Sequence, residues 1–324
     1  MDYRRSSRDW RRPTIVSLLL VLAPCIAVGV ILGVNAMVAV LAAIAIPLAA
    51  VLWFQRGLRR RRMDRSVLVL TGIGMILLIL LLLPLVDLLT TTDPAAIVHM
   101  AQDPTVQEAL YLSLSTATSA TLLAVILGIP MGYVLAREEF TGKALVEAIV
   151  DMPVVVPHLV AGIALVFVFG RGGAVGGPLS HFNILITSTY WGIVLAMFFV
   201  SVPFVVNYAR EGFERVDPRM ETVSRTLGTT RAGAMLRVTF PLSWTSLLTG
   251  AIMTWARAIS EFDTVALVAY YPRTINTLFY EWFRFHGYTY SRPLAAFMLL
   301  VALAIFIALR ALAAWGRPVN DDRA

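Results

Sequence analysis

The apolar residues of this chain fall in long blocks separated by short polar segments, with no alternation of polar and apolar positions. A run of about 18 or more apolar residues with almost no charge is long enough to cross the hydrocarbon core of a bilayer. We predict eight such spans, at residues 14–33, 36–55, 67–89, 110–136, 148–169, 190–208, 242–262 and 294–315. Because a backbone in lipid must satisfy its own hydrogen bonds, each span is expected to be a helix. The pattern therefore predicts an all-α polytopic membrane protein.

The spans and their polar connections divide the chain into four segments. Residues 1–66 are predicted to form a transmembrane hairpin around Asn35 and a basic loop, and residues 67–107 a further span and an outer connection. Residues 108–312 carry the remaining spans and the informative motifs, and residues 313–324 form a short tail. Proline residues in or beside the spans are expected to kink or end helices, and these are Pro130, Pro153, Pro157 and Pro203.

The basic residues predict the orientation of the spans. Most of the 27 Lys and Arg residues lie at the N-terminus, in alternate connections and at the C-terminal end, all on one side of the eight-span arrangement. Basic loops face the cytoplasm, so both termini are predicted to be cytoplasmic, in a multi-pass protein of the cell membrane. The net charge of +7 is explained by this topology. A nucleic-acid partner is not expected, because no basic face with interleaved aromatic residues is present.

Composition excludes several kinds of chemistry on this chain. The chain is 58% hydrophobic and 15% charged, with one cysteine and four scattered histidines, so no metal cluster is expected. Its one Gly-Lys pair, Gly142-Lys143, is followed by Ala144 and lacks the upstream glycine of a P-loop. We therefore expect no catalytic residues, no metal site and no nucleotide site here.

One charged pair stands out near the outer end of the span at 242–262. Arg257 and Glu261 are four residues apart, close enough to pair on one helix face, with Ser260 beside them. One interpretation is a pair that extends to the outer interface of the bilayer. The other is a polar lining of a translocation pathway by Arg257, Ser260 and Glu261, in which the arginine favours an anion. The sequence leaves both interpretations open.

The polar segment from Arg210 to Pro241 is predicted to carry a short surface helix. Asp217-Pro218 suits a helix start, with Asp217 as the N-cap and proline at the first position. The composition of residues 219–227 is compatible with a helix, and Gly228 suits its C-terminus. A second short helix is expected to lead to Pro241. A partner that gripped such a helix would move the spans on either side.

This segment resembles the cytoplasmic EAA loop of binding-protein-dependent ABC importer permeases, whose pattern is Glu-Ala-Ala, three residues, Gly, nine residues and Ile-x-Leu-Pro. In register, Thr222, Val223 and Ser224 take the Glu-Ala-Ala places, and Gly228, Val238 and Pro241 follow at the matching spacing. The departure is Thr222 where the family has Glu. Glu221, one residue earlier, or Arg225 is then the candidate for the contact usually made by that glutamate.

The resemblance extends over most of residues 108–310 and favours one branch of the family. The stretches 151–158 and 161–164 are similar to molybdate, tungstate and sulfate permeases. Residues 255–262, followed by Tyr270-Tyr271-Pro272, look most like the tungstate/molybdate permeases. Asp263 departs from that branch, in which glycine often stands at this position.

The resemblance implies a type I ABC importer fold, with six spans in the permease region and the N-terminal hairpin in addition. It implies import of tungstate or molybdate, a homodimer, two cytoplasmic ABC ATPase subunits and an extracytoplasmic substrate-binding protein. The ATPases would grip residues near 217–234, and ATP and Mg would bind to them, with no cofactor on this chain.

Three alternatives remain from the residues alone. One is a permease for another substrate, such as sulfate. Another is a secondary carrier, which predicts ionisable residues at mid-membrane and an inverted repeat. The third is a membrane enzyme, which needs convergent catalytic groups at one face. The spans show none of these last features, and the acidic residues within 137–151 are interpreted as a solvated connection.

Overall fold

The computed structural model describes residues 65–315, and within them every regular element is a helix. The predicted N-terminal hairpin at 14–33 and 36–55 and residues 316–324 of the predicted tail lie outside this range. The all-α class is confirmed for the part of the chain that the structure describes.

The helices keep close to the predicted spans. The span at 67–89 lies in α3 (Arg65–Thr90), that at 110–136 in α5 (Pro104–Arg137) and that at 190–208 in α9 (Tyr190–Glu214). The span at 242–262 corresponds to α12 (Phe240–Ile259), and that at 294–315 to the end of α14 (Ile275–Trp315). The remaining elements are α4 (Pro94–Gln102), α6 (Lys143–Val155), α7 (His158–Phe169), α8 (Gly176–His181), α10 (Pro218–Thr226), α11 (Arg231–Ala234), η1 (Met235–Thr239) and α13 (Asp263–Val268).

These residues form two compact units. One comprises residues 65–102 with His286–Leu300, and the other comprises Asp103–Phe285 with residues 301–315. The second unit contains the predicted loop and the predicted pathway residues, so the following description concerns that unit.

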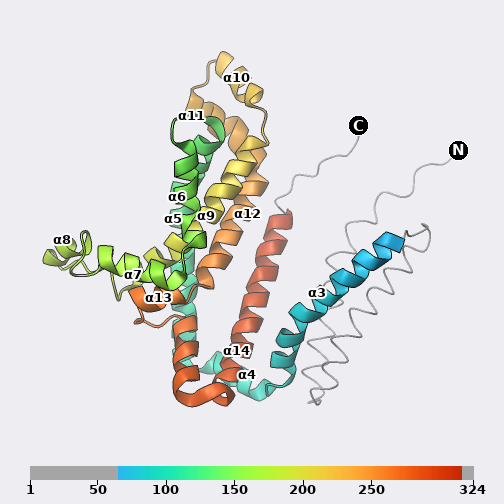
Figure 1. The fold of residues 1–324 in the computed structure, drawn as a ribbon, viewed down its shortest axis with the longest axis vertical. Coiled ribbons are helices and arrows are strands. Elements are labelled where there is room, and N and C mark those ends of the chain that lie inside the picture. Colours follow the sequence, from blue (N-terminus) through green and yellow to red (C-terminus); the bar gives the residue numbers. More distant parts are fainter. Residues whose placement is uncertain (1–64, 316–324) are drawn as a thin grey trace. The chain divides into compact units, whose positions relative to one another are not determined.

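A bundle of α5, α6, α9 and α12 forms the centre of the second unit (Figure 1). Helix α5 begins where Asp103 caps the amides of Thr105 and Val106, with Pro104 in the first turn. It packs most extensively on α9, and α9 packs in turn on α12. Several side chains buried at the centre are alanines, as at Ala117, Ala120 and Ala196, which lets the helix backbones approach closely.

The close approach of α5 and α9 depends on two glycines. A Cβ added at Gly132 would lie 2.7 Å from the Ala209 Cβ and 2.8 Å from the Val206 carbonyl oxygen. A Cβ added at Gly128 would lie 2.6 Å from the Val205 Cγ1. Glycine is the residue that fits at both positions without displacing the neighbouring helix.

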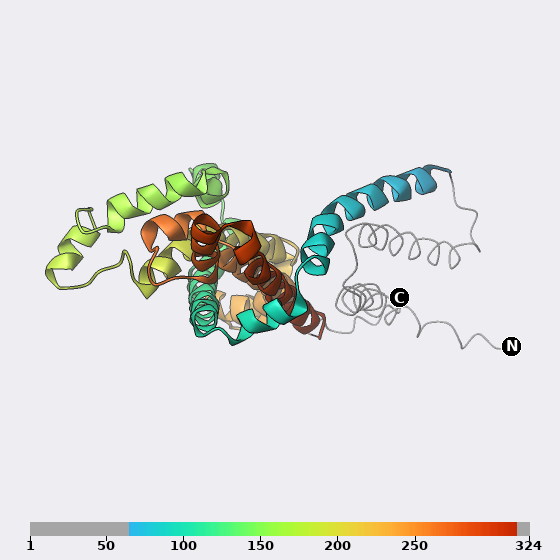
Figure 2. The same ribbon diagram turned by 90° about the horizontal axis from the view of Figure 1, so that it is seen from below.

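The single span predicted at 148–169 is instead two helices, α6 and α7, that meet at 111°. The chain leaves the helical conformation at Val156 and Pro157, because a residue before proline is driven out of the α region and proline lacks an amide hydrogen. Helix α7 turns away from the bundle, with α8 beyond it, in both views (Figures 1 and 2). By contrast, α5 and α9 continue through Pro130 and Pro203.

Three described helices are long and apolar enough to cross a membrane, namely α5, α9 and the part of α14 from Ile275 to Leu309. The total is up to five if each of the two bent pairs, α3 with α4 and α6 with α7, is one span. Helix α12 is outside this set, although its 20 residues would span about 30 Å. The number of eight spans therefore stays a prediction.

Candidate coupling and pathway sites

The predicted surface helix is α10, on the connection between α9 and α12, and it lies beyond the ends of these two helices (Figure 1). Asp217 is its N-cap and accepts a hydrogen bond of 2.9 Å from the Arg219 amide, and Pro218 is its first residue. Both assignments were predicted from sequence. The cap satisfies an amide that the first turn of the helix leaves unpaired.

Gly228 ends α10 as predicted, by a defined mechanism. Its φ of +92° is in the left-handed region that favours glycine. The Gly228 amide donates to the Arg225 carbonyl (3.0 Å) and the Thr229 amide to the Ser224 carbonyl (3.3 Å), which is the Schellman pattern. The Ser224 and Thr229 hydroxyls are 2.8 Å apart and reinforce this turn.

One face of α10 exposes apolar side chains. Met220 is 47% exposed, Val223 58% and Leu227 81%. Their spacing of three and four residues aligns them along one side of the helix. Thr222 and Arg225 are also exposed, and the Thr222 hydroxyl donates to the Pro218 carbonyl of its own helix. An apolar stripe on a short polar surface helix is typical of a docking surface.

Glu221 points away from this exposed face, into the protein. It is 8% exposed. The Tyr133 hydroxyl donates to its Oε2 (2.8 Å), while Arg137 Nε (2.8 Å) and the Thr239 hydroxyl (2.6 Å) donate to its Oε1. Of the two residues predicted to replace the family glutamate, Arg225 is therefore the exposed one.

We call Tyr133, Arg137, Glu221 and Thr239 the Glu221 cluster. Burial works against the charged form of Glu221, but the hydrogen bonds from Thr239, Tyr133 and Arg137 outweigh it and hold the pKa of Glu221 below its ordinary value. Arg137 also donates to the Val216 carbonyl (2.8 Å), just before α10. The cluster thus contains a charged, paired glutamate near neutral pH.

Val238 and Pro241 lie at the junction that leads into α12. Val238 belongs to η1, a π-helical turn, and Pro241 lies in the first turn of α12. The second short helix predicted before Pro241 is α11, and α11, η1 and α12 follow one another without a break. The wider π-helical turn includes Thr239 of the Glu221 cluster.

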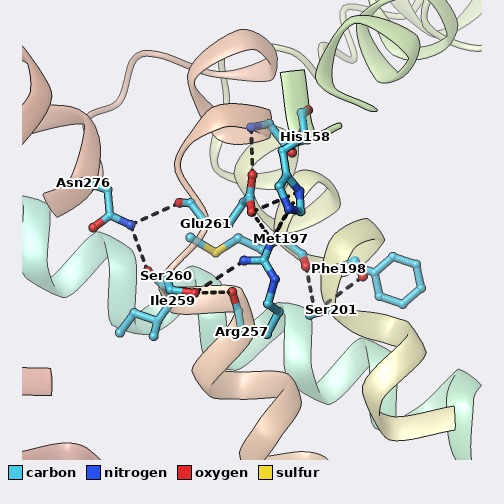
Figure 3. A network of polar contacts seen from close by, with 10 residues as sticks. His158, Met197, Phe198, Ser201, Arg257, Ile259, Ser260, Glu261 and Asn276 are labelled. Carbon is cyan, nitrogen blue, oxygen red and sulfur yellow. Dashed lines mark hydrogen bonds and ion pairs between the residues drawn. The ribbon is translucent and has the colours of Figure 1, made fainter. Parts of the chain in front are cut away.

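The second predicted group, Arg257 with Glu261, forms a network at the other end of α12 (Figure 3). Arg257 Nη2 donates to Glu261 Oε2 at 2.7 Å, which confirms the predicted pairing. The same nitrogen lies 2.9 Å from Nε2 and 3.2 Å from Nδ1 of His158, the first residue of α7. Ser260 accepts from Arg257 Nη1 at 3.4 Å.

Arg257 and His158 of this network are partly exposed to solvent, whereas Glu261 is buried. The side chains of Arg257 and His158 are 22% and 34% exposed, whereas that of Glu261 is 2% exposed. Ser260 is exposed. Of the three residues predicted to line a pathway, Glu261 therefore lies behind the others.

Glu261 also holds the break between α12 and α13. Its Oε1 accepts from the Thr264 amide (2.9 Å) in the first turn of α13. The Asn276 side chain donates to the carbonyls of Ile259 (3.0 Å) and Glu261 (3.1 Å) (Figure 3). These bonds satisfy backbone groups that the end of α12 would leave unpaired.

Sequence reasoning missed four residues of these two groups, namely Tyr133, Arg137, Thr239 and His158. Tyr133 and Arg137 are four residues apart at the end of a predicted span, a spacing that places both on one helix face. His158 had no such signal, because its partner Arg257 is 99 residues away in the chain. The described residues contain no group of three or more His, Cys, Asp or Glu residues placed to hold a metal ion.

The bundle contains two helices long and apolar enough to cross a membrane, α5 and α9, and a capped helix, α10, on the connection between α9 and α12, which together indicate the class of membrane domains. Comparison with known proteins identifies the family. Residues 109–318 match the family described as binding-protein-dependent transport system inner membrane component, and the chain belongs to it. It is therefore a permease subunit of the ABC importer type, and a multi-pass membrane protein.

Its relatives cover most of the chain. The molybdate/tungstate transport system permease protein WtpB of Thermococcus kodakarensis is 42% identical over 251 residues, which are 77% of this chain and 96% of the relative. WtpB of Pyrococcus furiosus is 42% identical over 258 residues, or 79% and 98% of the two chains. The sulfate transport system permease protein CysT of Synechocystis is 29% identical over 253 residues, or 76% and 88%.

Solved structures share the fold at low sequence identity. A bacterial alginate ABC transporter in complex with its pentasaccharide-bound periplasmic protein matches with a TM-score of 0.57 and 17% identity, over 80% of this chain and 96% of that chain. The MetNI methionine ABC transporter in inward-facing conformations matches with a TM-score of 0.53 and 15% identity, over 65% and 95%. These likenesses support the fold of an ABC importer permease.

Proposed function

We propose that this chain is the permease of an ATP-driven importer of molybdate and tungstate, and that a partner ATPase docks on the exposed face of α10. The observation that carries the docking surface is the stripe of Met220, Val223 and Leu227 on a helix capped firmly at both ends. ATP and Mg bind to the partner, and this chain hydrolyses no nucleotide. The basic connections favour a cytoplasmic position for α10 and both termini, and this orientation is part of the proposal.

The substrate assignment rests on the relatives. At 42% identity, the two WtpB proteins carry the name molybdate/tungstate permease, and the sulfate permease is more distant at 29%. A sulfate permease is therefore the second candidate. The remaining partners are an extracytoplasmic oxyanion-binding protein and a second copy of this chain.

The exposed donors of Arg257 and Ser260 line the pathway in this proposal. They offer positive charge and hydrogen bonds to a tetrahedral oxyanion, with His158 beside them. Glu261 stands behind Arg257 and balances its charge, so an anion is held weakly and released. Weak contact suits a pathway, because transport requires departure as well as entry.

The docking surface is tested by placing a charge on it. Val223→Asp and Leu227→Asp should abolish co-purification of the ATPase and ATP-dependent uptake, because a carboxylate would be buried without a partner in the interface. Thr222→Ala is the matched control, since its hydroxyl bonds only within α10, and it should keep both activities. Full association in both aspartate variants would refute the docking surface.

The substrate and the energy source are tested in proteoliposomes with the ATPase and the binding protein. Labelled tungstate uptake should require ATP and be inhibited by excess molybdate more strongly than by sulfate or phosphate. Stronger inhibition by sulfate would establish the second candidate. Uptake that persisted without ATP would favour a secondary carrier.

A further inference from the structure

We infer that the Glu221 cluster is the mechanical link through which a displacement of α10 reaches the membrane helices, with Glu221 as its positioning residue. This inference rests on the proposed function, in which a partner ATPase moves α10. In this inference, Glu221 transmits the movement of α10 to the helices within the permease. The partner ATPase contacts the exposed face of α10 instead.

The first observation is the set of elements that meet at one carboxylate. Tyr133 and Arg137 lie on the last turns of α5, and Thr239 lies on η1 at the start of α12. Their three hydrogen bonds to Glu221 are 2.6 to 2.8 Å long. A single side chain of α10 therefore bonds to the end of α5 and to the turn that leads into α12.

The second observation is that, among the described residues, α10 has no other side-chain hydrogen bond that reaches α5 or the turn before α12. Within residues 65–315, the other side-chain hydrogen bonds of α10 are local. They join Asp217 to Arg219, Thr222 to Pro218, Thr226 to Val223, and Ser224 to Thr229. Such bonds shape α10 and its end, and they do not restrain α5 or α12.

The third observation is burial. Glu221 and Tyr133 are each 8% exposed, Thr239 is fully buried, and the Arg137 side chain is 7% exposed. A charged pair excluded from water cannot exchange its bonds for water at little cost, unlike an exposed pair. The cluster therefore resists separation when α10 is displaced, and the ends of α5 and α12 move with it.

A nearby ion pair provides the comparison. Glu139, two residues after the end of α5, pairs with Lys143 at 2.8 Å in the connection to α6. The Glu139 side chain is 89% exposed and that of Lys143 is 20% exposed. Water is free to replace this pair, so it is not expected to transmit force.

The test measures coupling in the reconstituted permease, ATPase and binding protein. Glu221→Gln should keep ATPase association and ATP hydrolysis but lower uptake per ATP hydrolysed about tenfold, because the charged bond to Arg137 is lost. Glu139→Gln, the same chemical change in the exposed pair with Lys143, should stay near the wild-type ratio. The inference is overturned if Glu221→Gln keeps the wild-type ratio, or if both variants lose it equally.

Two gentler variants keep the test decisive if Glu221→Gln does not assemble. Tyr133→Phe removes one donor and keeps the edge-to-face contact with Phe213, whose ring centroid is 5.5 Å away. Thr239→Val removes the other hydroxyl at similar volume. Each should lower the ratio partially, and the double variant should lower it further. An unchanged ratio in the double variant would overturn the inference.

A distance measurement tests whether the Glu221 cluster keeps α10 and the end of α5 together. Spin labels at Thr226→Cys on α10 and Val134→Cys on α5, in a Cys25→Ala background, should report one distance through the ATP cycle in the wild type. In Tyr133→Phe with Thr239→Val the distance should change between the nucleotide-free and ATP-bound states. A distance that already changes in the wild type contradicts the link. Failure of ATP-dependent uptake in the wild type would instead refute the proposed function.

Discussion

Neighbouring residues on α10 have opposite surroundings, because a helix turns by about 100° per residue. Thr222 is exposed and bonds to its own helix, whereas Glu221 is buried among Tyr133, Arg137 and Thr239. In the aligned motif, Glu221 precedes the position of the family glutamate by one residue. On the helix, however, its side chain points into the protein, whereas Thr222 at the glutamate position is exposed. Arg225, Val223 and Leu227 remain as the outward-facing residues.

The depressed pKa of Glu221 predicts a specific pH dependence of stability. Its ionised form is favoured in the folded state, so its stabilisation is fully present above the ordinary glutamate pKa of 4.5 and is lost as pH falls through the depressed pKa. Glu221→Gln should destabilise the protein by about 3 kcal/mol at pH 7, because Arg137 loses its buried partner. In thermal denaturation, the gap between wild type and variant should shrink below about pH 4. A gap that widened on acidification would contradict the assignment.

We predict that glycine is required at position 228 because of its backbone conformation, and not because a larger side chain would clash with its neighbours. Nothing lies within 4 Å of a Cβ built there, but its φ is +92°. Gly228→Val should destabilise the end of α10 by about 1–2 kcal/mol and reduce ATPase association, while Gly228→Asn should be milder, since asparagine tolerates this region. Gly172→Ala is the control, because it also has open space and carries no positive φ. Equal effects of valine and asparagine would refute a conformational cause.

At the scale of elements, the break between α6 and α7 has the clearest consequence. Pro157 ends the helical path, and the 111° bend lets His158 meet Arg257 of α12. The Thr264 hydroxyl of α13 donates to the His158 carbonyl at 3.1 Å. A straight span would have carried His158 along the direction of α6. The bend thus brings three elements to one polar network (Figure 3).

The contact of α5 with α9 predicts different tolerance at its two glycines. Gly132→Ala should destabilise the protein by about 1–3 kcal/mol, because the new methyl group meets the Val206 carbonyl of the backbone. Gly128→Ala should cost less, since its nearest contact is a side-chain methyl group of Val205 and not a backbone atom. Melting temperatures in detergent would compare the two variants. A larger loss at Gly128 would contradict this packing.

At the scale of the whole molecule, the orientation in the membrane remains a prediction from charge. In a Cys25→Ala background, Thr226→Cys on α10 and Gly172→Cys between α7 and α8 both place an exposed thiol. An impermeant maleimide added to intact cells should label position 172 and leave position 226 unlabelled until the cells are opened. The reverse labelling pattern would show that the predicted orientation is wrong. A cytoplasmic ATPase could then not reach α10.

The helices and the caps were predictable because their causes are local. Asp217-Pro218 and Gly228 carry the start and end of α10 within a few residues, and apolar blocks of membrane length mark α3, α5 and α9. The pairing of Arg257 with Glu261 was also predictable, since the two residues lie only four apart in the chain, although Glu261 falls just beyond the end of α12. Pro157 signalled a disturbance of the span, but not the direction of the following helix.

The sequence by itself determined the helical class, the approximate positions of most described helices and the register of the loop, because periodicity, capping and proline act between near neighbours. Only the tertiary structure decided which side chains meet across helices. Arg137 reaches Glu221 over 84 residues, and Arg257 reaches His158 over 99. Such contacts depend on how separate helices pack and bend, which no local pattern encodes. That packing is what turned Glu221 from a candidate partner contact into an internal link.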